Sequence, residues 1–198
     1  MPAGRDRFDQ ARLINIANVL TALRVALIPL FAYLLISGKE PEALIVFAVC
    51  GASDGLDGLL ARWLRQRTLA GAYLDPIADK LLMATAFVVL AYVRVVPNWL
   101  AILVISRDIF ILVGVSLYLL LQVDTGVQPT ALSKVNTVVQ ILTVTYFLAV
   151  VAFPEGADAL GVGEGSTVAR GGVLLCAATT AASGAHYVSL GIRKLSGG

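Results

Sequence analysis

Residues 54–79 read DGLDGLLARWLRQRTLAGAYLDPIAD. This stretch covers the end of a long apolar run at residues 43–64, a short basic connection, and the start of a second apolar run at residues 73–93. Inside or at the edge of these runs lie four aspartates: Asp54, Asp57, Asp75 and Asp79. A membrane-spanning helix needs about 20 mostly apolar residues, so both runs are long enough to cross a bilayer. A carboxylate facing lipid costs at least about 2.5–3.5 kcal/mol, so four of them require a compensating interaction. This stretch predicts a membrane protein with a charged site between two helices.

The whole chain has the composition of a membrane protein. Of its 198 residues, 58% are hydrophobic and 14% are charged, whereas a soluble domain is about 45–50% apolar and about 25% charged. This composition excludes a soluble globular enzyme, a disordered chain and a disulfide-rich secreted module. The net charge of +2 gives no reason to expect a nucleic-acid partner. Cys50 and Cys176 both lie in apolar runs, which is typical of packing residues.

Six apolar runs are long enough to span a bilayer. They cover about residues 19–37, 43–64, 73–93, 99–121, 132–153 and 168–190. Glycines and prolines separate neighbouring runs, and the connections are short, which favours an up-down bundle. We therefore expect an all-α polytopic membrane protein, a single domain over residues 1–198 with six transmembrane helices. A short interfacial amphipathic helix over residues 1–15 is expected to precede them.

The positive charges predict the orientation. If the N-terminus is cytoplasmic, nine basic residues lie on the cytoplasmic side: Arg5, Arg7, Arg12, Arg62, Arg65, Arg67, Lys134, Arg193 and Lys194. Only three lie on the opposite side: Lys39, Arg94 and Arg170. Because cytoplasmic loops carry an excess of Lys and Arg, both termini are expected in the cytoplasm. The expected location is a bacterial inner membrane, with the aspartates near the cytoplasmic side.

The spacing of the aspartates brings them together. Asp54 and Asp57 are three residues apart and Asp75 and Asp79 are four apart, so each pair shares a helix face. The short connection predicts that the two helices are antiparallel neighbours, which lets the pairs converge. Converging carboxylates repel unless cations neutralise them, and hard divalent ions such as Mg²⁺ or Mn²⁺ prefer oxygen ligands. Two such ions would form a clamp for phosphoryl chemistry.

Two other interpretations of the aspartates are open. They could form a set of buried ion pairs, in which Asp54 or Asp57 neutralises a basic residue: the candidates are Arg24, Arg62, Lys80 and Arg107. They could also line a path for cations or protons, as in a small transporter. A transport path predicts carboxylates spread through the membrane depth, whereas these four gather near one interface. Small residues around them, such as Gly51, Gly55 and Gly58, open a groove for a ligand, which favours an enzyme.

The residues match a known pattern at this point. Eight positions fit D-x2-D-G-x2-A-R-x8-G-x3-D-x3-D without a gap: Asp54, Asp57, Gly58, Ala61, Arg62, Gly71, Asp75 and Asp79. The stretch resembles the signature of the CDP-alcohol phosphotransferase family. The segment from Asn15 to Arg24, which contains Asn18 and Thr21, also looks like the first helix of these enzymes. One departure is Ala17, where bacterial phosphatidylglycerophosphate synthases commonly carry proline.

The resemblance implies a fold and an activity. It implies six transmembrane helices and transfer of a phosphatidyl group from CDP-diacylglycerol to an alcohol, with release of CMP. Asp54, Asp57 and Asp75 would bind two divalent metal ions, and Asp79 would be both a metal ligand and the general base. The residues that would contact the CDP portion or its diphosphate are Gly58, Ala61, Arg62, Thr68, Asn18 and Thr21. Relatives are often homodimers, so a homodimer is a further expectation.

The later helices are expected to bind the acceptor alcohol. The candidate residues are Arg107, Lys134, Asn136 and Gln140, and Ser133 and Thr137 share their polar stripe. The segment 133–140 looks like that of CMP-forming cardiolipin synthases, which favours phosphatidylglycerol as the acceptor. The alternative is glycerol 3-phosphate, whose two negative charges call for more basic residues than this region carries. Arg107 and Asp108 lie inside an apolar run, so they either face the cavity or form a local ion pair.

Overall fold

The computed structural model describes the backbone of residues 16–64, 69–120 and 130–196, and the side chains of residues 21–53, 77–114 and 130–190. Over the described residues the chain forms seven helices and no strand. They are α1 (Ile16–Ile36), α2 (Glu40–Leu64), α3 (Leu69–Tyr92), α4 (Asn98–Leu120), α5 (Ala131–Ala152), α6 (Pro154–Ala159) and α7 (Thr167–Ser196). The expected interfacial helix over residues 1–15 lies outside this part of the chain.

The six long helices confirm the all-α prediction, and their ends lie close to those of the predicted runs. The six-residue helix α6 was not predicted. Pro154 occupies its first turn, where the missing N–H of proline is tolerated. Within the described residues, two segments are long and apolar enough to cross a membrane: Ala131–Ala152 and Thr167–Leu190.

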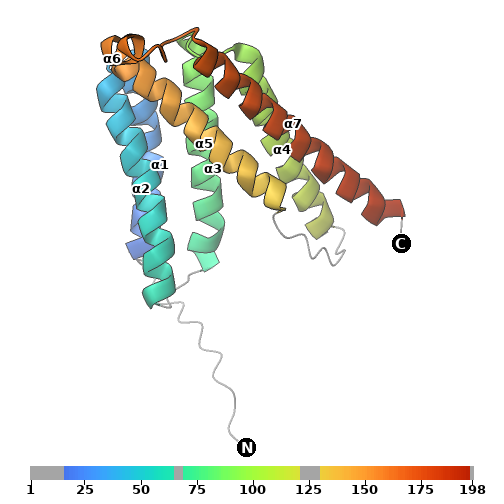
Figure 1. The fold of residues 1–198 in the computed structure, drawn as a ribbon. Helices are drawn as coiled ribbons and strands as arrows, with labels where there is room; N and C mark the ends of the chain where they lie inside the picture. The colour runs from blue at the N-terminus through green and yellow to red at the C-terminus, as the bar shows by residue number, and fades with distance from the viewer. Residues whose placement is uncertain (1–15, 65–68, 121–129, 197–198) are drawn as a thin grey trace, which may run out of the picture.

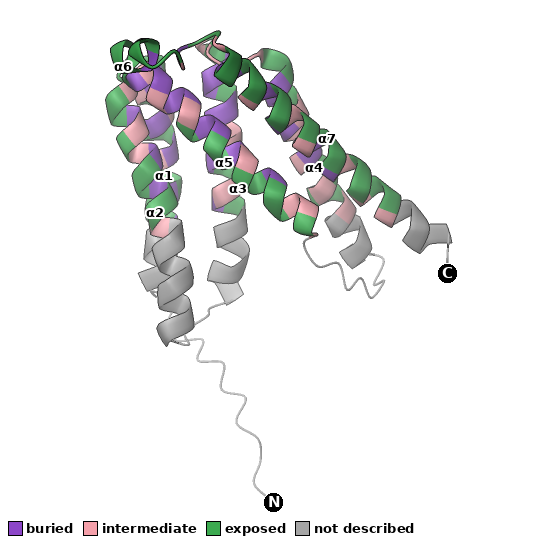
Figure 2. Cartoon of the chain, in the orientation of Figure 1, coloured by how far each residue is buried: buried purple, intermediate pink, exposed green. Residues whose placement is uncertain are grey.

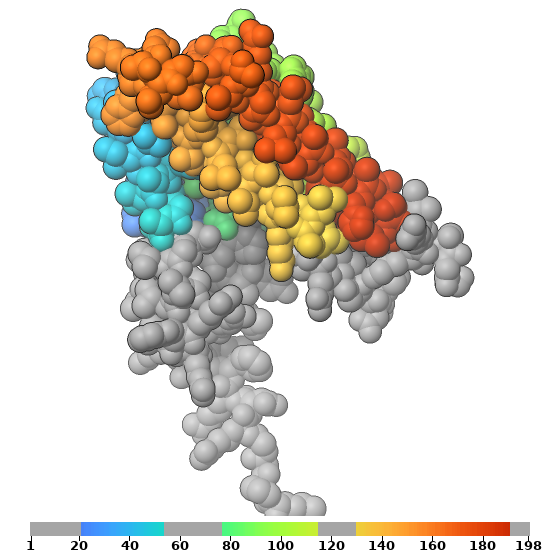
Figure 3. Space-filling view, in the orientation of Figure 1, coloured from blue at the N-terminus to red at the C-terminus, as the bar shows by residue number. Residues whose placement is uncertain are grey.

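The helices form two groups joined by α5 (Figure 1). Helix α1 packs against both α2 and α3, the two helices that carry the predicted aspartates. Helix α4 packs against α3 and α7, and α5 crosses obliquely to contact α2, α3 and α7. Figure 3 shows α5 and α7 side by side along one face of the molecule. Helix α5 carries residues that are expected to bind the acceptor, and it also contacts α2 and α3, which carry the predicted aspartates.

Apolar side chains fill the interior where α1, α2, α3 and α5 meet. The most completely buried are Phe31, Phe87, Leu90, Leu100 and Leu148. The rings of Phe31 and Phe47 lie 5.8 Å apart between α1 and α2. Cys50 and Cys176 are buried, free thiols, which confirms that they are packing residues.

The outside of the bundle carries many large apolar side chains. Exposed side chains include Ile102, Phe110, Leu142 and Leu174, while the buried set includes Arg24, Arg107, Asn136 and Gln140. Figure 2 shows the exposed residues on the outer helix faces and the buried ones between helices. Apolar side chains on the outside and a few polar side chains buried between helices fit a bundle surrounded by lipid, because polar groups in a bilayer must find partners inside the protein.

Two helices end in the same capping turn. After α1, Lys39 N–H donates to Leu34 O at 2.9 Å and Gly38 has φ 70°. After α3, Val95 N–H donates to Leu90 O at 3.0 Å, and here Arg94 has φ 67°. The first turn uses the glycine that a left-handed backbone favours, and the second uses an arginine.

Candidate functional site

The four predicted aspartates lie on two helices that are both packed against α1. Asp54 and Asp57 belong to α2, and Asp75 and Asp79 belong to α3. Each pair lies within one continuous helix, at the spacing that predicts a shared helix face. The side chain of Asp79 is described, whereas those of the other three lie outside the described residues.

Asp79 is joined to a fully buried arginine. Arg24 of α1 donates from Nη1 to Asp79 Oδ1 at 2.9 Å. The Arg24 side chain is 0% exposed, whereas that of Asp79 is 44% exposed. Thr21, one turn before Arg24 on α1, is buried as well. Arg24 was predicted as a possible ion-pair partner of Asp54 or Asp57, whose side chains lie outside the described residues. The ion pair that the structure describes joins Arg24 to Asp79, the aspartate that the motif implies is the base.

A second set of ion pairs starts at the next residue of α3. Lys80 Nζ lies 2.9 Å from Asp108 Oδ1 on α4. Arg107 Nη1 lies 2.7 Å from the same oxygen, so two cations share one carboxylate. The local ion pair predicted for Arg107 and Asp108 is therefore present, and it extends to Lys80.

Arg107 links three helices from a buried position. Its Nη2 donates to Ser133 Oγ of α5 at 2.7 Å and to Ser183 Oγ of α7 at 2.6 Å. Its guanidinium also lies 5.9 Å from the ring centroid of Tyr187, within cation–π range. The Arg107 stem packs close to the α7 backbone at Gly184, where a Cβ would lie 3.6 Å from Arg107 Cγ, an ordinary van der Waals distance.

A polar triad lies between α5 and α7. Thr180 Oγ1 donates to Asn136 Oδ1 at 2.9 Å, and Gln140 Nε2 donates to Thr180 Oγ1 at 3.3 Å. All three side chains are buried. In the described part of the chain, the buried donors Asn136 Nδ2 and Arg107 Nε have no hydrogen-bond partner. Buried donors without an acceptor are costly, so this interface is suited to an oxygen-rich ligand or water.

The predicted polar stripe of α5 is partly correct. Asn136 and Gln140 point inward, and Ser133 reaches Arg107. Thr137 is exposed, and its hydroxyl donates to Ser133 O of its own helix, so its inward placement was wrong. Lys134 is exposed at the start of α5.

Seven of the predicted contacts to metal or CDP have no described side chain: Asn18, Asp54, Asp57, Gly58, Ala61, Arg62 and Asp75. Thr68 lies outside the described backbone as well. Among the described residues no group of three His, Cys, Asp or Glu side chains could hold a metal ion. The oxygen donors of the four aspartates are nonetheless the ligand type that Mg²⁺ and Mn²⁺ prefer, and the partly exposed Asp79 carboxylate suits such a role.

Sequence reasoning missed two residues of α7, Thr180 and Ser183. They are three residues apart, so they share a helix face, and that face meets the polar stripe of α5. The signal was present as small hydroxyl residues at helical spacing in an apolar run.

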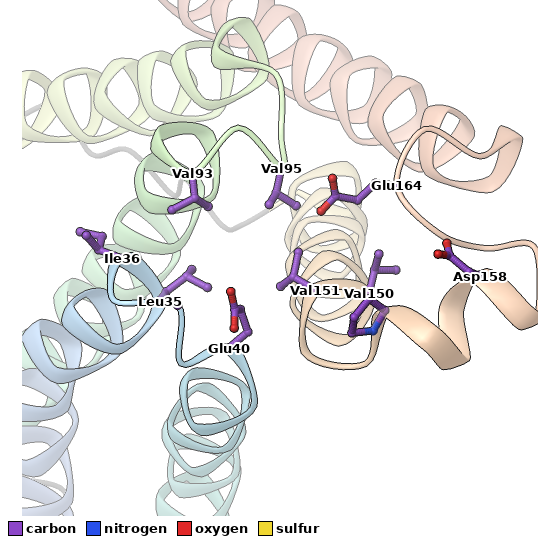
Figure 4. A pocket seen from close by; sticks show the side chains of 11 residues that line it. Leu35, Ile36, Glu40, Val93, Val95, Val150, Val151, Asp158 and Glu164 are labelled. Carbon is purple, nitrogen blue, oxygen red and sulfur yellow. The ribbon is translucent and has the colours of Figure 1, made fainter.

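A cavity of about 630 Å³ lies at the end of the bundle near α6. Apolar side chains such as Leu35, Val93 and Val151 line it together with three carboxylates, those of Glu40, Asp158 and Glu164 (Figure 4). None of the predicted site residues lines this cavity. It lies toward the opposite ends of α2 and α3 from the aspartates.

Comparisons with known proteins point to one family. A family model described as CDP-alcohol phosphatidyltransferase matches residues 14–181. The chain is 36% identical over 155 residues to a human protein named cardiolipin synthase (CMP-forming), covering 70% of this chain and 52% of that protein. It is 31% identical over 195 residues to a probable phosphatidylglycerophosphate synthase of Mycobacterium tuberculosis, covering 95% of this chain and 87% of that protein.

A third relative is also bacterial. The chain is 34% identical over 182 residues to the Bacillus subtilis CDP-diacylglycerol–glycerol-3-phosphate 3-phosphatidyltransferase, covering 80% of this chain and 92% of that protein. The chain spans about half the length of the animal cardiolipin synthases that it matches.

Proposed function

Because the chain belongs to the CDP-alcohol phosphatidyltransferase family, we propose that it transfers the phosphatidyl group of CDP-diacylglycerol to an alcohol and releases CMP. The observation that carries this proposal is the setting of Asp79. This residue closes the eight-position motif, is partly exposed, and is held at 2.9 Å by the buried Arg24. A fixed but accessible carboxylate is what a general base requires.

The proposed chemistry uses the four aspartates together. Asp54, Asp57, Asp75 and Asp79 would hold two divalent ions, Mg²⁺ or Mn²⁺. When bound, such ions neutralise a diphosphate and stabilise the charge that develops at the attacked phosphorus. Asp79 accepts the proton of the acceptor hydroxyl. The acceptor oxygen then bonds to the lipid-side phosphorus, while the bond from that phosphorus to the CMP oxygen breaks.

The CDP portion of the donor is proposed to contact three other motif residues and three polar residues outside the motif. Gly58 and Ala61 leave room beside α2, and Arg62 pairs with a phosphate. Thr68, Asn18 and Thr21 supply polar groups near the nucleotide and the diphosphate. The burial of Thr21 one turn from Arg24 supports a place for it on the inner face of α1.

The proposed acceptor is phosphatidylglycerol, which makes the product cardiolipin. Arg107, Asn136 and Gln140 line the α4–α5–α7 interface, where two buried donors have no partner, and Lys134 lies at the start of α5. Lys80 and Arg107 share Asp108, so this cluster carries one net positive charge. One net charge suits the single negative charge of a phosphodiester better than the two of a phosphomonoester.

Glycerol 3-phosphate is the second candidate acceptor. It is favoured by the relatives of similar length, because the phosphatidylglycerophosphate synthase match covers 95% of this chain and 87% of that protein. The two acceptors predict different lipid products from the same donor. The family match gives no support to a cation or proton transporter.

The membrane placement extends the proposal. We place all six long helices across the bilayer, with both termini and the aspartates on the cytoplasmic side of a bacterial inner membrane. The apolar outer faces of α4 and α7 support contact with lipid or with a second copy in a homodimer.

The test is the identity of the product made by purified protein in detergent. The protein receives CDP-diacylglycerol with Mg²⁺ or Mn²⁺ and either phosphatidylglycerol or glycerol 3-phosphate, and mass spectrometry follows CMP and lipids. Cardiolipin with CMP supports the favoured acceptor, and phosphatidylglycerophosphate supports the alternative. Absence of CMP with every alcohol would contradict the proposed activity and reopen the transport hypothesis.

A further inference from the structure

Helix α3 is held by ion pairs on two sides at consecutive residues. Asp79 meets Arg24 of α1 at 2.9 Å, and Lys80 meets Asp108 of α4 at 2.9 Å. Consecutive residues lie about 100° apart around a helix, so the two pairs point toward different neighbours. Packing against α1, α4 and α5 already limits the rotation of α3 about its axis. Two pairs in different directions restrict that rotation further.

The anchor for Lys80 is itself fixed. Asp108 Oδ1 also accepts from Arg107 Nη1 at 2.7 Å, and Arg107 is bonded to Ser133 and Ser183 on two further helices. The Arg107 side chain is only 5% exposed, whereas that of Lys80 is 34% exposed. Asp108 is thus the point where the partly exposed Lys80 joins the hydrogen-bonded α4–α5–α7 junction.

We propose that Asp108 is a positioning residue for Asp79: by holding Lys80 it sets the rotation of α3 and thereby the direction of the Asp79 carboxylate. This inference rests on the proposed function, because it gives the position of Asp79 its catalytic meaning. It also assigns a role to Lys80, a residue adjacent to the motif. The same contact connects the helices that carry the aspartates to those proposed to bind the acceptor.

The geometry separates this role from simple packing. Replacing Asp108 with asparagine removes the charge that holds both Lys80 and Arg107 Nη1, while Arg107 keeps its bonds to Ser133 and Ser183. Lys80→Met removes the Lys80 contact alone and leaves the Arg107–Asp108 pair in place. Lys80 is partly exposed, so it can turn away without leaving a buried charge. A misplacement of about 1 Å at a reacting group can lower the rate about 100-fold. The loss should therefore fall on kcat rather than on binding of the lipid donor.

The experiment compares Asp108→Asn, Lys80→Met and Lys80→Arg in the full chain in detergent, with CDP-diacylglycerol and phosphatidylglycerol. Asp108→Asn and Lys80→Met should each lower kcat about 10- to 100-fold and leave KM for CDP-diacylglycerol within about twofold. The double variant should be no worse than Asp108→Asn alone, because Lys80→Met removes only a contact that Asp108→Asn already removes. Lys80→Arg keeps the charge and should retain most activity. Lys39→Met, an exposed lysine at the far end of the bundle, is the matched control.

A second readout does not depend on turnover. Electron paramagnetic resonance of Mn²⁺ titrated into each variant measures metal affinity at a site that includes Asp79. Asp108→Asn and Lys80→Met should weaken Mn²⁺ binding about tenfold, and Lys39→Met should not change it. If Asp108→Asn does not fold, Lys80→Met tests the same contact from its exposed side.

The outcomes separate the two proposals. Wild-type kcat and Mn²⁺ affinity in both Asp108→Asn and Lys80→Met would overturn the positioning role and leave the proposed function intact. Equal losses in Lys80→Met and Lys80→Arg would overturn it too, because the contact would then not act through charge. Weakened Mn²⁺ binding in the two variants of a protein that makes no CMP would support positioning and contradict the proposed function.

Discussion

Arg24 Nη1 of α1 lies 2.9 Å from Asp79 Oδ1 of α3. The arginine side chain is completely buried, whereas the aspartate side chain is 44% exposed. The guanidinium holds one oxygen of the carboxylate through a charge-assisted hydrogen bond. The aspartate is thereby fixed without being covered. This arrangement brings a residue from the first helix into the site that the motif places on the second and third helices.

Asp79→Asn should abolish CMP release while the protein stays folded. Asparagine keeps the shape of the side chain but cannot accept the proton of the acceptor hydroxyl, and losing a general base costs about 10²- to 10⁴-fold in rate. The measurement is CMP formation by mass spectrometry, with size-exclusion chromatography to verify folding. Asp158→Asn, an exposed aspartate beside the distant cavity, is the matched control and should keep wild-type turnover. Near-normal turnover in Asp79→Asn would show that another group is the base.

Asp57→Asn should weaken metal binding as well as turnover. The motif places Asp57 among the metal ligands, and an amide oxygen is a poorer ligand for a hard divalent ion than a carboxylate. We expect metal affinity to fall by at least about 10-fold, since changes one shell further out already cost that much. Titration with Mn²⁺ followed by electron paramagnetic resonance measures the affinity. Unchanged affinity would remove Asp57 from the ligand set.

The sequence predicts the helices well because each apolar run is long and nearly all are bounded by glycine or proline, while the run at residues 43–64 ends at the basic stretch 65–67. It also predicts the aspartate faces, since helical spacing alone brings residues three or four apart together. Helix α6 escapes prediction because its six residues, Pro154–Ala159, are too few to show a hydrophobic period.

Contacts between helices far apart in the sequence are harder to predict than the set of residues that share one helix face. Periodicity marks Asn136 and Gln140 as neighbours, yet it does not say that α7 supplies Thr180 as their partner. Thr137 belongs to the same polar stripe but lies at the edge of the inward face. There its hydroxyl bonds to Ser133 O, so it needs no partner from another helix.

Arg94→Gly should stabilise the turn after α3, and Gly38→Ala should destabilise the matching turn after α1. Both positions have positive φ, at 67° and 70°, and a left-handed backbone costs a residue with a Cβ about 1–2 kcal/mol. A Cβ at Gly38 would come no closer than 3.9 Å to Glu40 Oε1, so the effect there comes from the backbone rather than from a clash. We expect shifts of about 1 kcal/mol in opposite directions in the free energy of unfolding. Denaturant titration in detergent measures both, and equal signs would contradict the backbone explanation.

Thr180→Val should loosen the interface between α5 and α7. Valine has nearly the shape of threonine but makes neither the 2.9 Å bond to Asn136 nor the 3.3 Å bond from Gln140. Both partners are buried, so they are left without an acceptor or donor, and we expect unfolding to become easier by about 1–2 kcal/mol. Thr145→Val is the matched control, because Thr145 is exposed and bonds only to Ile141 O of its own helix.

The same substitution also tests the proposed acceptor interface. Releasing Asn136 and Gln140 from Thr180 changes two residues proposed to bind the acceptor, while Arg24 and Asp79 keep their contact on the other side of the bundle. We therefore expect KM for phosphatidylglycerol to rise and KM for CDP-diacylglycerol to stay unchanged. Steady-state kinetics with each substrate varied in turn measures both constants. A rise confined to the donor constant would move the acceptor away from the α5–α7 interface.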